Sequence, residues 1–495
     1  MSMTEASSRY FRQVAGQWDQ IRAGYFGPEV RQSAIAKAYL RPEMAVADVG
    51  GGTGFLTEAL AALVRRVYLV DASEEMLEVA RKNLSHLSNV EFHHSDGLSL
   101  PFPDESLDAV FANMYLHHTP DPQAAIREMV RVLRPGGRLV ITDMDEHPYA
   151  WLKEEMADVW QGFDRQSVRN WFREAGLVNI IVDCTGQSCC ARSASPAISD
   201  PAGREAVISV FVATGTRRLP MRAAVQENYA ALAASPASCH CTPSPESASC
   251  CSTAPEGNIP CCCAPGENEV NFAAGYSPNE LTGAPAEAAE FSLGCGNPFA
   301  FASLKPGEVV LDIGSGGGLD AFLAAQKVGP AGRVIGVDMT PAMLERARAT
   351  AARNGLTNVE FRQGEAEALP VADQSVDVIL SNCVINLTED KGQVFREAFR
   401  VLKPGGRLEV SDVVASGPLP FELQIDSAGW AGCITGALPE KEYIDLMAQA
   451  GFTDIIVRRS PTLGQAGDVA IYSAGISARR PTGEPASTPC GCGSS

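Results

Sequence analysis

The 495-residue sequence lacks features that would place it in several common classes of protein. It has no apolar run of the ~18 residues that a membrane-spanning helix needs, and residues 1–10 are polar without an apolar signal core. Basic residues are in deficit, since 40 Lys and Arg face 59 Asp and Glu for a net charge of -19. Such a chain binds phosphate backbones and anionic lipid poorly. We therefore expect a soluble, cytoplasmic protein that binds a small molecule, with no nucleic acid and no membrane as partner.

Cysteine, in contrast, is abundant. Fifteen cysteines would indicate disulfides in a small secreted chain, but in a large chain without a signal segment they favour metal or metalloid binding, or catalysis. Nine of them lie in two polar segments rich in Ser and Pro, at positions 239, 241, 250, 251, 261, 262, 263, 490 and 492.

A glycine-rich turn preceded by an acid occurs twice. It reads Val-Ala-Asp-Val-Gly-Gly-Gly-Thr-Gly at 46–54 and Val-Leu-Asp-Ile-Gly-Ser-Gly-Gly-Gly at 310–318. Two landmarks follow each copy at nearly the same offset, an apolar run that ends in an acid (68–71, 334–338) and a Pro-Gly-Gly hinge (133–138, 402–407). The chain is therefore a duplicated domain.

The length fits this duplication, because 495 residues exceed what one hydrophobic core usually serves. We predict domains at 1–217 and 270–480, a Cys-rich flexible linker at 218–269 and a flexible tail at 481–495. The centre of the linker, dense in Ser, Pro, Ala and Cys, has no apolar period.

Both domains show the pattern of an α/β fold. Short β-rich runs alternate with helical stretches such as 74–84 and 341–354, which predicts a parallel sheet with helices on both faces. Each domain closes with two apolar runs that no helix separates. These runs predict an antiparallel pair of strands at one edge of the sheet.

The glycine turns lack the third glycine of the dinucleotide fingerprint G-x-G-x-x-G, where Phe55 and Leu319 stand instead. Glycines at every second position, an acid before the first of them and the Pro-Gly-Gly hinge resemble class I methyltransferases that use S-adenosylmethionine. That resemblance implies two Rossmann-like domains, each with a mostly parallel seven-stranded sheet and an antiparallel edge pair. A nicotinamide enzyme and an unliganded scaffold are the alternatives.

The same resemblance implies two cofactor sites. Asp71 and Asp338 would accept hydrogen bonds from the ribose hydroxyls, and Asp96 and Glu365 would meet the adenine edge. The other implied cofactor-binding residues lie in the glycine turns or at strand ends: Asp48, Gly50, Gly52, Gly54, Asp312, Gly314, Gly316, Gly318, Met339, Ala366 and Asn382.

Three single cysteines of the second domain lie near the predicted crevice. Cys295 precedes the first strand, Cys383 ends the fourth, and Cys433 follows the fifth. In an open α/β sheet, ligands bind outside the carboxyl ends of the strands. A lone cysteine among apolar neighbours is often only a small buried hydrophobe. Three of them, each beside turn glycine or asparagine, favour a function.

Residues 225–475 closely resemble arsenite methyltransferases. The segments that carry the resemblance are 225–229, 292–298, 312–318, 337–340, 381–387 and 432–433. In that family an upstream linker cysteine and cysteines that match Cys295, Cys383 and Cys433 handle trivalent arsenic. The resemblance implies an enzyme of arsenic detoxification that methylates arsenite and methylated arsenite.

Arsenic chemistry agrees with this assignment, because a soft, thiophilic centre selects thiolates. Cys383 and Cys433 are the predicted As(III) ligands, with Cys295 and one cysteine of 261–263, assigned as Cys263, as third ligand and redox partner. Thiolate-bound As(III) would attack the sulfonium methyl in line, which requires mainly positioning. A disulfide formed in turnover would need thioredoxin or glutathione as reductant.

Other interpretations remain open. The linker cysteines could pass metalloid on or bind zinc, although they lack the usual spacing of structural zinc sites. The enzyme could instead methylate carbon or oxygen of a small quinone-like acceptor, or the cysteine-rich segments could act as a metalloid-binding module without catalysis.

The first domain resembles the broader small-molecule methyltransferase superfamily, including quinone-pathway enzymes. After its fourth strand it has His117 and His118 where the second domain has cysteine. Either histidine could be a general base or merely start a helix. Cys184, Cys189 and Cys190 fall in a predicted edge loop, as an accessory metalloid site or as plain surface.

Overall fold

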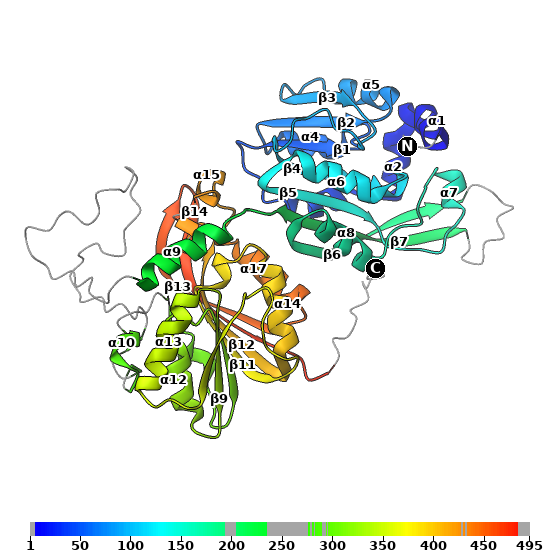
Figure 1. Ribbon diagram of the computed structural model, residues 1–495. Coiled ribbons are helices and arrows are strands. Elements are labelled where there is room, and N and C mark those ends of the chain that lie inside the picture. The colour runs from blue at the N-terminus through cyan, green and yellow to red at the C-terminus, as the bar shows by residue number, and fades with distance from the viewer. Residues whose placement is uncertain are drawn as a thin grey trace, which may run out of the picture. The chain divides into compact units, whose positions relative to one another are not determined.

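The computed structural model describes residues 5–193, 204–234 and 276–483, except 278–279, 282, 290–293, 295, 427–428 and 431–432. The chain divides into two compact units, unit 1 over residues 1–219 and unit 2 over residues 220–484 (Figure 1). Within the described ranges, no helix is long and apolar enough to cross a membrane.

Unit 1 is an α/β unit with a seven-stranded sheet in the order β3-β2-β1-β4-β5-β7-β6. Its strands are β1 (Ala45–Val49), β2 (Arg66–Asp71), β3 (Val90–His94), β4 (Leu107–Asn113), β5 (Leu133–Met144), β6 (Leu177–Arg192) and β7 (Glu205–Arg217). Its helices are α1 (Glu5–Val14), η1 (Ala15–Gln17), α2 (Trp18–Tyr25), α3 (Pro28–Ala36), α4 (Phe55–Ala61), α5 (Glu74–Asn83), η2 (Leu116–His118), α6 (Pro122–Val132), α7 (Leu152–Glu155) and α8 (Arg165–Glu174).

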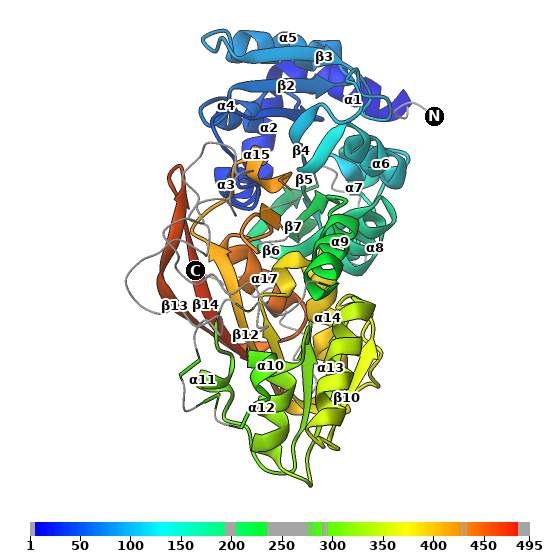
Figure 2. The same ribbon diagram turned by 60° about the vertical axis from the view of Figure 1, so that its left-hand side comes forward.

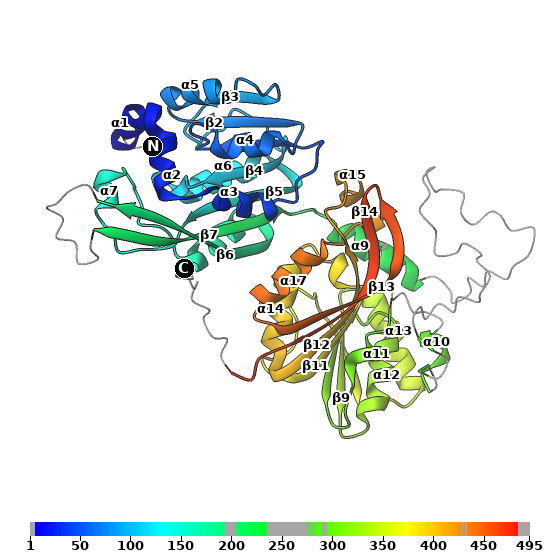
Figure 3. The same ribbon diagram turned by 180° about the vertical axis from the view of Figure 1, so that it is seen from behind.

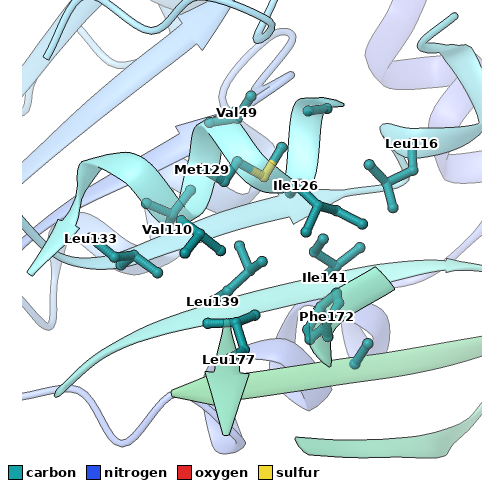
Figure 4. Close-up of a cluster of buried hydrophobic side chains, with 14 of the residues drawn as sticks. Val49, Val110, Leu116, Ile126, Met129, Leu133, Leu139, Ile141, Phe172 and Leu177 are labelled. Atoms are coloured by element: carbon teal, nitrogen blue, oxygen red, sulfur yellow. The ribbon is translucent and has the colours of Figure 1, made fainter. Parts of the chain in front are cut away.

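The central strands of unit 1 are mostly apolar because both faces of the sheet are covered. All five residues of β1 are buried. Figure 4 shows one side of this core, where Val110 of β4 and Leu139 and Ile141 of β5 pack with Ile126 and Met129 of α6. This packing fixes the carboxyl ends of β1 and β4 at one edge of the sheet.

Unit 2 repeats the arrangement in the order β10-β9-β8-β11-β12-β14-β13. Its strands are β8 (Val309–Ile313), β9 (Arg333–Asp338), β10 (Val359–Gln363), β11 (Val376–Asn382), β12 (Leu402–Ala415), β13 (Thr453–Ala466) and β14 (Val469–Arg479). Its helices are α9 (Arg222–Ala234), α10 (Ala286–Ala289), α11 (Phe299–Ala302), α12 (Leu319–Val328), α13 (Pro341–Arg353), η3 (Ile385–Leu387), α14 (Lys391–Val401), α15 (Phe421–Gln424) and α17 (Glu440–Gln449).

The predicted fold class is confirmed in both units. Strands β1 to β5 pair in parallel, and β7 runs antiparallel to β5 and β6. Strands β8 to β12 are likewise parallel, and β14 is antiparallel to both of its neighbours, β12 and β13. Strands β13 and β14 form the long strand pair seen in Figure 3. Equivalent aspartates, Asp121 and Asp390, cap α6 and α14 with their side chains, so the duplication extends to helix starts.

One helix lies inside the segment assigned above to a linker. Helix α9 falls within 218–269, yet it belongs to unit 2 and packs beside α13 (Figure 2). Six of its thirteen residues are alanine, a strong helix former, and Val225 in its first turn is fully buried. The Ser- and Pro-rich composition on which the linker prediction rests begins only after this helix, so unit 2 starts at 220 rather than 270.

Candidate functional site

A cleft lies at the carboxyl ends of β8, β9 and β11 in unit 2. The turn after β8 is held by backbone hydrogen bonds, because Gly314 and Ser315 donate to the Val337 carbonyl at 2.7 and 3.0 Å. Asp338, at the end of β9, accepts from the Gly316 amide with one oxygen (3.0 Å) and from the Thr340 amide with the other (2.8 Å). The predicted acid therefore joins the glycine turn to the start of α13.

Gly314, Gly316 and Gly318 of this turn have different structural roles. All have positive φ, +70° at Gly314, +47° at Gly316 and +93° at Gly318. An added Cβ would collide with Val384 at Gly314 and would lie 2.7 Å from Phe322 at Gly318. At Gly316 it would meet nothing within 4 Å, although Gly316 lines the cleft. Gly316 is thus where a ligand can approach the backbone.

The predicted cofactor residues divide between the cleft wall and its support. Gly314, Gly316, Asp338, Met339, Glu365, Ala366, Asn382 and Cys383 line the cleft. Asp312 is only 1% exposed and does not line it, and burial raises its pKa well above the ordinary value. Gly318 also stays behind the wall, as the left-handed residue that starts α12. Asp312 and Gly318 therefore shape the turn.

Glu365 does not stand alone at the rim of the cleft. Its carboxylate lies 2.6 Å from the Arg222 guanidinium, which also contacts Glu367 at 3.1 Å. The Arg222 amide donates to Glu389 at 2.8 Å. Arg222 and Tyr229, both on α9, line the cleft. Sequence reasoning gave neither residue a role, because α9 lay in the supposed linker.

Unit 1 contains an equivalent cleft. Asp71 accepts from the amides of Gly52 and Ser73, each at 2.8 Å, as Asp338 does in unit 2. The predicted residues Asp48, Gly50, Gly52, Asp71 and Asp96 line this cleft, while Gly54 starts α4 behind it. Phe11, Trp18 and Arg22 of α1 and α2 line it too. In each unit, helices that precede the first strand thus complete the cleft.

The two described cysteines of the predicted arsenic site come together. Cys383, at the end of β11, is 3% exposed, and Cys433, which follows β12, is 5% exposed. Both belong to one buried cluster, and the Cys433 Sγ donates to the Cys383 carbonyl at 2.9 Å. Cys383 lines the cleft, whereas Cys433 lies behind its wall.

The environment of Cys433 controls its ionisation. Burial, with a smaller contribution from nearby Asp412, raises the pKa of the thiol to about 12, and a hydrogen bond with the Tyr229 hydroxyl opposes the rise. Asp412 is fully buried, and burial raises its pKa to about 7. The Lys391 ammonium, 1% exposed, donates to the carbonyls of Asn386 and Thr388 at 3.2 and 2.9 Å. Sequence reasoning missed all three polar neighbours, since nothing in their spacing marks them.

Two other predicted thiols, Cys263 and Cys295, lie outside the described residues. Cys383 is disulfide-bonded, and Cys433 is free. In unit 1, Cys184 is disulfide-bonded, whereas Cys189 and Cys190 are free, the first buried and the second exposed. These three belong to β6, rather than to the edge loop that the sequence predicted.

The comparison of the two units corrects one expectation. Neither His117 nor His118 occupies the position in unit 1 that is equivalent to Cys383 in unit 2. Met114 does, because Met114 and Cys383 each follow a strand-end asparagine, have φ of 53° and 57°, and donate to the neighbouring strand at 2.8 Å. His117 matches Asn386 instead, since both amides donate to equivalent aspartates. Spacing alone does not resolve an offset of three residues in a turn.

Comparison with known proteins agrees with this architecture. Residues 47–141 and residues 304–451 each match a family model described as a methyltransferase domain. Together with the two sheets and the two clefts, these matches place both units in the class of S-adenosylmethionine-dependent methyltransferases.

Within that class, the chain is a homologue of arsenite methyltransferases. It is 52% identical to the arsenite methyltransferase of Halobacterium salinarum over 178 residues, 36% of this chain and 45% of the relative. It is 43% identical to the arsenite methyltransferase of Homo sapiens over 152 residues, which are 29% of this chain and 40% of the relative. The chain thus spans about half the length of the curated relatives it matches.

A solved structure of an arsenic(III) S-adenosylmethionine methyltransferase from Chlamydomonas reinhardtii is also similar. It is 38% identical in sequence, with a TM-score of 0.38, and the match covers 41% of this chain and 73% of that one.

Proposed function

We propose that unit 2 methylates trivalent arsenic with S-adenosylmethionine. The observation that carries the proposal is the pair of buried cysteines, one on the cleft wall and the other hydrogen-bonded to its backbone. Two sulfurs in one buried, mostly apolar cluster suit a soft atom better than an oxygen or carbon acceptor. The printed names of the homologous arsenite methyltransferases support the same substrate.

The cleft fits a nucleoside cofactor. Gly316 offers open backbone, Asp338 and Glu365 offer carboxylates, and Met339 and Ala366 offer apolar contact on the same wall. These residues would hold S-adenosylmethionine, which supplies an electrophilic methyl group on a sulfonium. The carboxylates would accept hydrogen bonds from the ribose and the adenine edge.

The cysteines prepare the substrate. Arsenite exchanges its hydroxyls for thiolates and releases water, so that the arsenic lone pair stays free. We propose that this lone pair forms the As–C bond in line as the C–S bond of the sulfonium breaks, and the electron pair of the broken bond stays on S-adenosylhomocysteine. Positioning provides most of the catalysis. No general base is needed, because no proton leaves arsenic.

Methyl transfer oxidises arsenic from the +III to the +V state, so two electrons must return before the next cycle. Two thiolates can supply them and form a disulfide, which thioredoxin or glutathione then reduces. Cys383 is disulfide-bonded in this structure, which supports a redox role for this sulfur. We assign Cys295 and Cys263 as third ligand and redox partner, and the whole reaction to arsenic detoxification.

The test is to incubate the full chain with S-adenosylmethionine and a thiol reductant, with and without arsenite, and to measure S-adenosylhomocysteine. We expect arsenite to stimulate its formation, and Cys383→Ser or Cys433→Ser to abolish the stimulation. Cys190→Ser, at an exposed cysteine of unit 1, should leave it unchanged. Turnover of a quinone-like acceptor by the Cys383→Ser variant, or arsenite binding without S-adenosylhomocysteine, would contradict the proposal.

A further inference from the structure

Unit 1 contains a buried cluster of side chains that could bind a metal ion, and none of them is a cysteine. His117 and His118 lie on η2, directly after β4, and Asp158 lies between α7 and α8. One nitrogen of each histidine and one carboxylate oxygen lie within 4.8 Å of one another. Asp158 Oδ1 is 3.9 Å from His117 Nε2 and 3.7 Å from His118 Nδ1. Tetrahedral zinc ligands at ~2.0–2.1 Å from the metal are about 3.3 Å apart, so small side-chain rotations would close the site.

A second carboxylate orients His117. Its Nδ1 lies 2.7 Å from Asp143 Oδ1, and Asp143 also accepts from the His117 amide at 3.3 Å. When Nδ1 carries the proton, the lone pair of Nε2 points toward His118 and Asp158. Metal-binding histidines usually donate from the far nitrogen to a carboxylate, a backbone carbonyl or water.

The cluster leaves buried polar atoms unsatisfied. Among the described residues, neither His118 Nδ1 nor Asp158 Oδ2 has a hydrogen-bond partner, although both atoms are buried. The Asp158 side chain is only 2% exposed. Each such atom costs about 1–3 kcal/mol if nothing satisfies it. A bound cation would satisfy this lone pair and this carboxylate oxygen together.

The cluster also adjoins open space. His117, His118 and Asp158 line one cavity together with Met144, Met156 and Cys189. His118 lines the cofactor cleft of unit 1 as well. A metal ion held here would have three protein ligands and a fourth position beside the cavity, which is the pattern of catalytic rather than structural zinc sites.

We propose that unit 1 binds one divalent transition-metal ion, for which zinc is best suited, through His117, His118 and Asp158. Asp143 positions His117 from behind. The open position takes the oxygen or sulfur of a small, largely apolar acceptor in the cavity, next to the cofactor cleft. Unit 1 would thus present an acceptor through a metal, while unit 2 uses cysteines.

The test uses the full chain with its accessible thiols alkylated by iodoacetamide, since linker cysteines would also take up metal. The chain is stripped with a chelator and loaded with Co²⁺. We expect one Co²⁺ per chain, with visible d–d bands but no thiolate charge-transfer band. Azide, as a small anionic probe, should shift these bands if the fourth position is open. A parent chain that binds no Co²⁺, or bands indifferent to azide, would overturn the proposal.

Variants locate the ion. Asp158→Asn keeps the shape of the side chain, and His118→Ala removes one ligand, so both should abolish the one-to-one Co²⁺ complex. Asp143→Asn should weaken binding by about 10- to 100-fold, as is typical of a group that orients a ligand. His86→Ala, at an exposed histidine of the same unit, is the matched control and should bind Co²⁺ normally. Full Co²⁺ binding by Asp158→Asn and His118→Ala would contradict the assignment.

Discussion

At the scale of single residues, the backbone at the two cysteines of unit 2 is unusual. Cys383 and Cys433 have φ of 57° and 64°, in the left-handed region that residues with a Cβ rarely adopt. Each such residue costs about 1–2 kcal/mol, and strain of this kind gathers at functional sites. Met114 of unit 1 shares the conformation with a φ of 53°. The strained turn is therefore common to both units, and the thiol is what unit 2 adds.

Tyr229 lowers the pKa of a thiol that burial raises to about 12. Tyr229→Phe removes one hydrogen bond to the Cys433 sulfur, worth about 0.5–1.5 kcal/mol. The thiolate is then harder to form, so arsenite methylation at neutral pH should fall about two- to tenfold and recover as the pH rises. The measurement is the pH profile of kcat/KM for arsenite. Tyr472→Phe, which removes a hydroxyl bonded to Glu440, is the control, and an unshifted Tyr229→Phe profile would disprove this role.

Asp412 makes the stability of unit 2 depend on pH. Its pKa is about 7 in the folded chain and about 3.9 in an unfolded one, so between these values the folded state holds a proton that the unfolded state has lost. This stabilisation is complete below pH ~4 and is lost as the pH rises through about 7, with a slope of at most about 1.4 kcal/mol per pH unit. Urea denaturation across this range should therefore show a shallower decline for Asp412→Asn. Asp468→Asn, at an exposed site, should match the parent, and equal slopes for all three proteins would refute the prediction.

At the scale of elements, the turn between β8 and α12 separates two roles of glycine. Gly316→Ala and Gly467→Ala both place a Cβ at positive φ, +47° and +64°, with nothing within 4 Å. Both variants should lose about 1 kcal/mol of stability through backbone strain. Only Gly316 lines the cleft, so only Gly316→Ala should raise the Kd for S-adenosylmethionine in unit 2, by about tenfold or more. Calorimetric titration measures this, and similar Kd values for the two variants would show that Gly316 does not face the ligand.

The sequence allowed the elements to be predicted better than the contacts between them. Apolar runs, glycine turns and the repeat define both sheets, because covered parallel strands are apolar and cofactor turns need glycine. The cleft acids Asp71 and Asp338 were found for the same reason. Arg222 and Tyr229 were missed, since their helix reaches the cleft only through tertiary packing. The aspartate partners of His117, Asp143 and Asp158, lie 26 and 41 positions away and carry no local signal.

At the scale of the whole molecule, the chain contains one fold twice, with different side chains after the fourth strand of each sheet. The cofactor turns are nearly identical, as the matching contacts of Asp71 and Asp338 show. The residues that follow the fourth strand differ, and our proposals assign the choice of acceptor to them. The two copies thus share the contacts of the glycine turn and differ in the side chains that follow the fourth strand.

This arrangement predicts two cofactor sites per chain. Calorimetric titration of the parent should give a stoichiometry of two S-adenosylmethionine molecules. Gly52→Ala, whose added Cβ lies 3.6 Å from Trp18 in the cleft of unit 1, should weaken binding in unit 1 and keep the site of unit 2 intact. Gly316→Ala should do the reverse. A single site in the parent, or loss of both sites in one variant, would contradict independent clefts.

The central claim is that arsenic held by Cys383 and Cys433 receives the methyl group in unit 2. Its most direct test is a single turnover of reduced full-length protein with arsenite and methyl-labelled S-adenosylmethionine, followed by identification of the labelled product. The account predicts labelled methylarsenic from the parent and from Cys190→Ser, and none from the Cys383→Ser/Cys433→Ser double variant. Equal labelling of arsenic by the double variant, or no labelled arsenic from the parent, would contradict it.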